Sequence, residues 1–197
     1  MSNLELSSIY SAGKQLGYSD FEQRGIEYLD SGFDSQVYSV GHQILKIYRQ
    51  HLEKTTRLFT GIRIGEHIKQ LEKYMQITNH LADQLSRKPH ILNYWWAENL
   101  QLVVNPISRM EWSEDLGCMV SLSTLIEGET VLSRHEQVVL GNDSRGKFAY
   151  ELGNESERLN ERGRCKGIYL DPINLRYQES HSSLVVTDIC KMVNFLR

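Results

Sequence analysis

Hydrophobic residues near the start of the chain are concentrated in three short segments, residues 26–31, 35–41 and 43–49. Polar residues and glycine separate these segments, and short apolar runs bounded by turn residues are typical of β-strands. The pattern therefore predicts three consecutive strands. Before them, residues 3–16 are expected to form a short helix that ends near Gly17.

A long helix is predicted over residues 62–87. Apolar and small residues recur there at spacings of three and four, which places them along one helix face. The residues on this face are Ile64, Ile68, Leu71, Met75, Thr78, Ala82 and Leu85. Pro89 is expected to stop the helix, because proline lacks the backbone N–H that a continuing helix needs.

Strands are predicted again after this helix, at residues 91–96, 101–110 and 117–126, with a hairpin turn at 113–117 between the last two. The remainder of the chain is more polar. A charged helix is expected within residues 147–162. Two further segments, 168–177 and 184–188, predict short strands on either side of a turn at 179–183.

Composition limits the classes of function. The chain has 197 residues, 40% of them hydrophobic, and a formal net charge of −3, which allows one core or two small lobes. The nearly balanced charge argues against nucleic acid or an anionic membrane as a partner. No apolar run approaches the roughly 20 residues of a membrane helix, and no signal peptide is recognisable. Three cysteines without paired spacing are expected to be free thiols in a reducing cytoplasm.

A single lysine, Lys46, lies in the middle of the apolar third strand. Burying a lysine is costly unless an anion neutralises it, so Lys46 is a candidate anion-binding residue. Two residues before Lys46 belong to the same pattern: Gly32 lies in the predicted turn between the first two strands, and Val37 lies in the second strand. Here the chain resembles the protein-kinase-like superfamily, most closely aminoglycoside and other small-molecule phosphotransferases. Asp30 and Ser35 occupy the positions of the other two glycines of that family's phosphate-binding loop.

The resemblance implies an ATP-binding site. In that family the strand lysine contacts the α- and β-phosphates, which assigns this role to Lys46, and Val37 matches the valine that packs on the adenine. A glutamate of the following helix holds the lysine. Glu72 lies beside the apolar face of the predicted helix and is favoured, whereas Glu66 lies closer to the usual sequence distance. The choice between these two glutamates stays open.

The resemblance also implies a hinge and a magnesium site. The strand that ends before Gly128 resembles the hinge, where the Thr124 carbonyl and the Ile126 N–H would pair with the adenine edge. Further on, Asn174 and Asp188 align with the loop asparagine and the metal-binding aspartate of kinases. Amide and carboxylate oxygens are the hard ligands that Mg²⁺ takes beside nucleotide phosphates.

The catalytic loop departs from the family pattern. Tyr169 occupies the position of the catalytic aspartate, and Gly167 that of the histidine two residues before it. Asp171 is a weak alternative base, because its offset of two residues places it elsewhere on the loop. No catalytic residue is therefore assigned.

These features together predict an α+β protein with a two-lobed kinase-like fold. Residues 1–25 are expected to be a helical extension, 26–126 an amino-terminal lobe with an antiparallel sheet and a long helix, and 127–197 a reduced carboxyl-terminal lobe. The predicted function is that of an ATP–Mg²⁺-binding protein with a degenerate catalytic loop, either a pseudokinase or a weak atypical phosphotransferase. Two alternatives stay open: a protein-interaction module that does not bind nucleotide, and a kinase completed by a second subunit.

Overall fold

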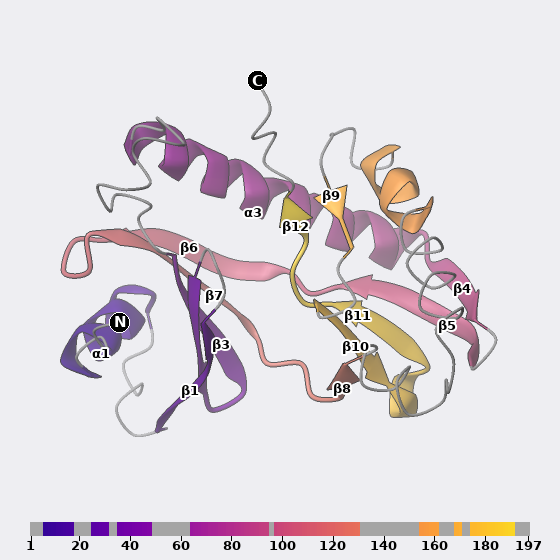
Figure 1. The fold of residues 1–197 in the computed structure, drawn as a ribbon, viewed down its shortest axis with the longest axis horizontal. Helices are drawn as coiled ribbons and strands as arrows, with labels where there is room; N and C mark the ends of the chain where they lie inside the picture. Colours follow the sequence, from indigo (N-terminus) through magenta and orange to yellow (C-terminus); the bar gives the residue numbers. More distant parts are fainter. Residues whose placement is uncertain are drawn as a thin grey trace. The chain divides into compact units, whose positions relative to one another are not determined.

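The structure, a computed structural model, describes residues 6–17, 25–31, 35–48, 64–94, 97–130, 154–161, 168–170 and 174–191. They form a mixed α+β protein with antiparallel and mixed sheets, which confirms the predicted class (Figure 1). Among the described residues, no helix is both long enough and apolar enough to cross a membrane.

The chain divides into two compact units. The first unit comprises Met1–Met75 and Ile107–Leu125, and the second comprises Gln76–Pro106 and Ile126–Arg197. One boundary falls within the long helix α3, Ile64–Arg87, whose bounds agree with the predicted helix.

The first unit is built on a five-stranded antiparallel sheet with the strand order β1-β2-β3-β7-β6. The three strands predicted near the start of the chain are confirmed, and the hairpin turn predicted at 113–117 joins β6 to β7. The bounds of the strands are Ile26–Ser31 for β1, Ser35–Val40 for β2, Gln43–Tyr48 for β3, Ile107–Ser113 for β6 and Cys118–Thr124 for β7.

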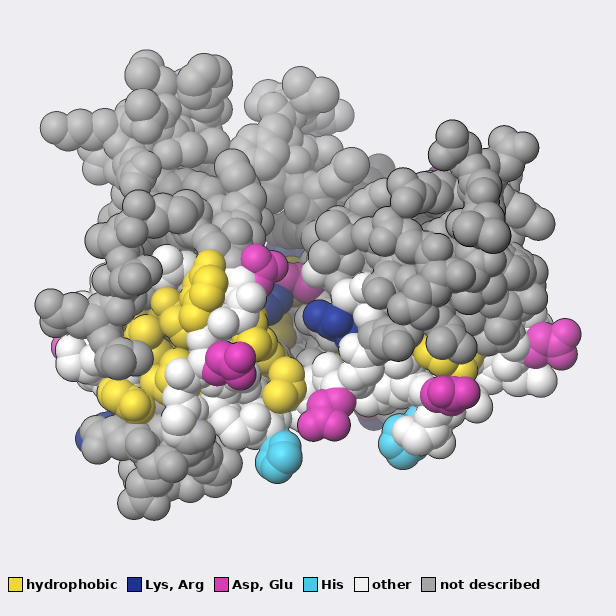
Figure 2. Space-filling view, turned by 60° about the horizontal axis from the view of Figure 1, so that its bottom comes forward, with side chains coloured by type: hydrophobic (Ala, Val, Ile, Leu, Met, Phe, Trp, Pro, Cys, Tyr) yellow, Lys and Arg dark blue, Asp and Glu magenta, His cyan; other side chains and the backbone are white. Residues whose placement is uncertain are grey.

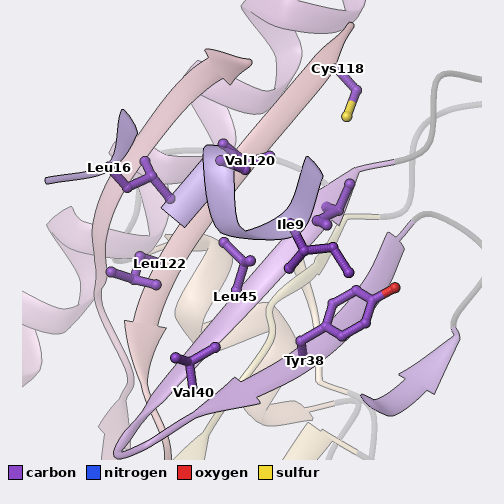
Figure 3. Packing of buried hydrophobic residues seen from close by; sticks show 10 residues of the cluster. Ile9, Leu16, Tyr38, Val40, Leu45, Cys118, Val120 and Leu122 are labelled. Atoms are coloured by element: carbon purple, nitrogen blue, oxygen red, sulfur yellow. The ribbon is translucent and has the colours of Figure 1, made fainter. Parts of the chain in front are cut away.

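One face of this sheet packs against the helix α1, Leu6–Gln15 (Figure 3). Ile9 and Ala12 of α1, with Leu16 just after it, meet the apolar side chains of the strands in a single buried cluster. The strand residues of the cluster are Tyr38, Val40, Leu45, Ile47, Cys118, Val120 and Leu122. These strand positions alternate with residues on the other face, as the period of two requires.

Polar contacts at the end of α1 fix it on the sheet. Arg109 of β6 donates a hydrogen bond from Nη1 to the Leu16 carbonyl at 2.5 Å, and Gln15 Nε2 donates to the Trp112 carbonyl. The last carbonyls of a helix have no partner within the helix and carry its negative end, which favours a guanidinium there. The helix α1 is therefore part of the core of the first unit.

The second unit contains a five-stranded sheet with the order β4-β5-β11-β10-β8. The pair β5–β11 is parallel and the other pairs are antiparallel. The bounds are His90–Tyr94 for β4, Ala97–Val104 for β5, Glu129–Thr130 for β8, Leu175–Gln178 for β10 and Ser183–Val186 for β11. A 3₁₀ turn, Glu179–His181, joins β10 to β11. A helix covers residues 154–161, and β9, Ile168–Tyr169, pairs with β12, Cys190–Lys191.

Two strand predictions were wrong in extent. The predicted strand at 101–110 is two strands in two different sheets, because β5 ends before Pro106 and β6 begins after it. Proline has no N–H to continue a ladder. The predicted strand at 168–177 is likewise split into β9 and β10. At the end of β9, the Leu170 N–H donates to the hydroxyl of Ser156 in the helix 154–161.

Candidate functional site

The candidate phosphate-binding lysine lies on β3 beside the candidate adenine-contacting valine on β2. In the ladder between these strands, Lys46 and Val37 are direct partners, and Ser121 of β7 lies opposite Lys46 on its other side. Direct partners in an antiparallel ladder share a face, with Cβ atoms about 5 Å apart. Lys46 therefore lies on the face opposite the core cluster, between two short side chains.

This face carries hydroxyl side chains, whereas the core face carries apolar ones. Short hydroxyl side chains follow one another across it, since Ser39 of β2 and Ser123 of β7 both pair with Ile44 of β3. A further hydroxyl comes from Tyr48, whose Oη lies 3.1 Å from Ser121 Oγ in a buried contact. A half-buried lysine among hydroxyl groups is a suitable setting for an anion such as a phosphate.

The turn that carries Gly32 lies outside the described residues. The strands that flank it close with the pair Ser31–Gln36, and the register shifts between Tyr28 and Asp30 on β1. Leu29 occupies this bulge and is 44% exposed, close to the Asp30–Val37 pair. Figure 2 shows hydrophobic side chains gathered on the surface of the first unit, with acidic side chains among them.

The helix α3 carries both candidate partners of Lys46. Glu66 and Glu72 have exposed side chains, whereas Thr78, Leu81 and Leu85 in the second half of α3 are buried. The predicted ion pair between Lys46 and one of these glutamates stays a prediction.

The candidate hinge begins at the end of β7. Leu125 donates its N–H to the carbonyl of His42, in the turn between β2 and β3, at 2.8 Å. Successive residues of a strand direct their backbone groups to opposite edges, so the Thr124 carbonyl points to the edge away from β3. The β6 ladder ends with the pair Ile107–Ser123, before it reaches Thr124. Ile126, the second candidate, follows as a half-buried residue.

The segment after the hinge is fixed on β10. Gly128 has a φ of +135°, and a Cβ atom there would lie 2.5 Å from the Tyr177 carbonyl oxygen. Only glycine tolerates both the positive φ and the close carbonyl oxygen without strain. Next to it, Glu129 pairs with Tyr177, and Gln178 Nε2 donates to the Glu127 carbonyl at 3.3 Å.

The two candidate magnesium ligands lie at the same end of the β10–β11 hairpin. Asn174 precedes β10 and Asp188 follows β11 by two residues, and the last pair of the hairpin is Leu175–Val186. The Asn174 carbonyl accepts two hydrogen bonds from Thr187, from the backbone N–H at 2.8 Å and from Oγ1 at 2.9 Å. These contacts place the backbone of Asn174 next to Thr187, the residue before Asp188, within the second unit.

The donor set around this pair fits Mg²⁺. Asn174 supplies an amide oxygen and Asp188 a carboxylate, both half-buried. Within the described part of the chain, no three His, Cys, Asp or Glu side chains cluster to hold a metal. A cation at this pair would complete its shell with phosphate and water oxygens, as Mg²⁺ bound to a nucleotide does.

Tyr169, at the position that the resemblance assigns to a catalytic base, lies in β9. Tyr169 pairs with Cys190 of β12, and Asp171 lies outside the described residues. The loop that starts after Tyr169 is tied to the helix 154–161, because Ser156 Oγ accepts the Leu170 N–H at 2.9 Å and both residues are buried.

A buried carboxylate anchors this helix. Glu155, next to Ser156, lies 2.5 Å from Nε2 of His90 on β4 and 2.6 Å from Nη1 of Arg158. Sequence analysis missed Ser156 and Glu155, because no local pattern distinguishes them from other polar residues of a charged helix.

The structure thus makes Val37 and Lys46 direct neighbours in the first unit. In the second unit it places Asn174 opposite Thr187, with Asp188 one residue further along the chain. That the two pairs act on one ligand stays a prediction. No protein-family model matches the chain, and no curated protein sequence matches it significantly.

Proposed function

We propose that this chain is a kinase-like protein that binds ATP with Mg²⁺ and has a degenerate catalytic loop. In this proposal the first unit corresponds to the sheet lobe of a two-lobed kinase-like fold, and the second unit carries the reduced catalytic part. The protein is then a pseudokinase or a weak, atypical phosphotransferase, and it acts in the cytoplasm.

The pairing of Val37 with Lys46 carries the proposal. It places an apolar contact for a base and a cation for phosphates side by side on the hydroxyl-bearing face of the first sheet. The strand order supports the same conclusion. Three consecutive strands, the helix α3 and, after β4 and β5 of the other sheet, a β6–β7 hairpin that joins the first sheet beside β3 agree in part with the order of strands, helix and strands expected from the resemblance.

The contacts of the second unit support the metal part of the proposal. The pairing of β10 with β11 in one register puts Asn174 opposite Thr187 and leaves Asp188 one residue further along the chain. Asn174 and Asp188 can then share one cation, whose charge offsets that of the phosphates.

The expected catalytic power is low. A positioned base contributes on the order of 10² to 10⁴ in rate. A free phenol titrates near 10, so tyrosine is a poor substitute for the aspartate base of an active kinase. Nucleotide binding needs no such base. The residues therefore favour ATP binding without efficient phosphoryl transfer. A Tyr169→Asp variant should raise any residual phosphoryl transfer, measured with radiolabelled ATP.

Thermal unfolding with and without ATP and Mg²⁺ tests the binding. A ligand at a hundredfold excess over its dissociation constant stabilises a protein by about 2.7 kcal/mol, which for a chain of this size raises the melting temperature by roughly 5 to 10 °C. Lys46→Met and Asp188→Asn should each remove most of this rise. Lys73→Met, which removes an exposed lysine of α3, is the matched control and should keep it.

A melting temperature that does not change at any nucleotide concentration, with or without Mg²⁺, rejects the proposal. It would favour the second candidate, an interaction module that does not bind nucleotide. The observation behind this alternative is the loss of two of the three loop glycines, since Asp30 brings a negative charge to the place where phosphates would lie. That module is expected to keep the same fold and melting temperature in all the variants above.

A further inference from the structure

A threonine outside the predicted site joins the two candidate magnesium ligands. Thr187 lies between Val186, the last residue of β11, and Asp188. Both of its hydrogen-bond donors, the backbone N–H and the side-chain hydroxyl, point to one acceptor, the Asn174 carbonyl, at 2.8 and 2.9 Å. A carbonyl oxygen has two lone pairs, so this contact uses its full accepting capacity.

The side-chain hydroxyl adds a second hydrogen bond to the one that the backbone N–H donates. Any residue other than proline at position 187 can donate the N–H, but the second bond requires a hydroxyl at this place. Threonine has few rotamers about χ1. The two bonds together therefore fix the Asn174 carbonyl relative to Thr187, whose backbone continues directly into Asp188.

Buried neighbours hold this contact from both sides. Leu175 and Val186 close the hairpin and are 0% and 1% exposed, and Ile189 after Asp188 is 2% exposed. The half-buried polar residues Asn174 and Asp188 therefore stand between apolar anchors, and Thr187 is the direct link between them.

We propose that Thr187 is a positioning residue for Mg²⁺, and that its hydroxyl keeps the amide of Asn174 and the carboxylate of Asp188 at the separation that one cation requires. The inference rests on the proposed function, because it concerns the same metal pair. The hydroxyl has no role in binding the nucleotide itself. Its removal must therefore weaken the part of ATP affinity that depends on Mg²⁺ and leave metal-free binding unchanged.

The test compares ATP affinity, measured by calorimetry, at saturating Mg²⁺ and in EDTA. In Thr187→Val, which keeps the shape and the backbone bond, the gain in affinity from Mg²⁺ should fall by roughly 3- to 10-fold, as expected for one lost hydrogen bond. Affinity in EDTA should stay within about twofold of the wild type. Thr187→Ser restores the hydroxyl and should recover most of the gain. Ser183→Ala removes a hydroxyl that donates to Gln178 at the opposite end of the β10–β11 hairpin and should change neither value.

Each outcome decides between distinct conclusions. If the wild type binds no ATP under either condition, the proposed function fails and this inference with it. If the wild type binds with a gain from Mg²⁺ and Thr187→Val keeps that gain, only the positioning role is rejected. An equal loss in Mg²⁺ and in EDTA also rejects it, because Thr187 would then support the fold alone. Failure of Thr187→Ser to recover the gain contradicts the role of the hydroxyl.

Discussion

Replacing Leu16 with alanine is expected to destabilise the first unit by about 3 kcal/mol. Leu16 is 0% exposed and shares the core cluster with Leu45 and Leu122. A buried leucine-to-alanine change loses the transfer free energy of the removed atoms and leaves a cavity, for a total of about 2 to 5 kcal/mol. Leu16 lies just after the last turn of α1 rather than within a strand, so the backbone there can partly close the cavity. We therefore expect a value in the lower half of that range.

Urea unfolding followed by tryptophan fluorescence measures this change. Trp112 is the only tryptophan left in a Trp95→Phe/Trp96→Phe background, and its carbonyl accepts a hydrogen bond from Gln15 of α1. With a slope of about 2 kcal/mol per molar urea, a loss of 3 kcal/mol lowers the midpoint by roughly 1.5 M. The matched control is Leu29→Ala, the same substitution at a 44% exposed site, which should cost no more than about 0.5 kcal/mol. Equal midpoints for the two variants would refute the packing of α1 on the sheet.

Two further predictions concern backbone geometry and a buried thiol. Gly128→Ala should destabilise the protein by about 1 to 3 kcal/mol in urea unfolding, because the new Cβ would meet a carbonyl oxygen of β10 at 2.5 Å. Gly65→Ala in α3 meets no atom within 4 Å and should be neutral or stabilising, so a destabilisation of equal size would contradict the argument. Burial raises the pKa of the Cys118 thiol from 9.0 to about 11. In a Cys165→Ser/Cys190→Ser variant, this thiol should react with a thiol reagent at neutral pH at least about 100-fold more slowly than in urea. Stability from its neutral form should be complete below pH 9 and fall as the pH rises toward 11, because the unfolded chain loses the proton first.

Local patterns predicted most of the elements but not the sheets to which they belong. The strands β1 to β3 and the helix α3 follow from short apolar runs and from spacings of three and four, which depend only on neighbouring residues. The parallel pairing of β5 with β11 joins Gln101 to Ser183, and no local signal marks it. The sequence therefore predicts the helices and strands more reliably than it predicts which strands pair with each other.

The break at Pro106 shows how a continuous pattern conceals a change of sheet. Apolar residues continue from Val103 through Ile107 with only Asn105 and Pro106 between them, which is why one strand was predicted. The Asn105 N–H donates to the Val186 carbonyl in the second unit, whereas Ile107 pairs with Ser123 in the first. The missing N–H of Pro106 was a usable signal for this boundary.

The candidate site depends on register, which composition and periodicity do not fix. The predicted strand limits left one residue between β2 and β3, whereas the turn has two, Gly41 and His42. Because Val40 pairs with Gln43, a two-residue turn makes Val37 the partner of Lys46. A turn shorter by one residue would shift the partner by one and move it to the core face.

The same reasoning applies to the metal pair. The 3₁₀ turn and Ser182, which has a φ of +45°, set the register in which Leu175 meets Val186. This register brings Asn174 opposite Thr187 and leaves Asp188 one residue beyond. A count of residues along the chain does not give this pairing, because it leaves the register of the hairpin open. The resemblance named the two candidate ligands, and the hydrogen bonds from Thr187 bring the backbone of Asn174 next to the residue before Asp188. The metal part of the proposal therefore depends on whether the two side-chain oxygens approach one cation, which the comparison of Thr187→Val with the wild type in Mg²⁺ and in EDTA tests.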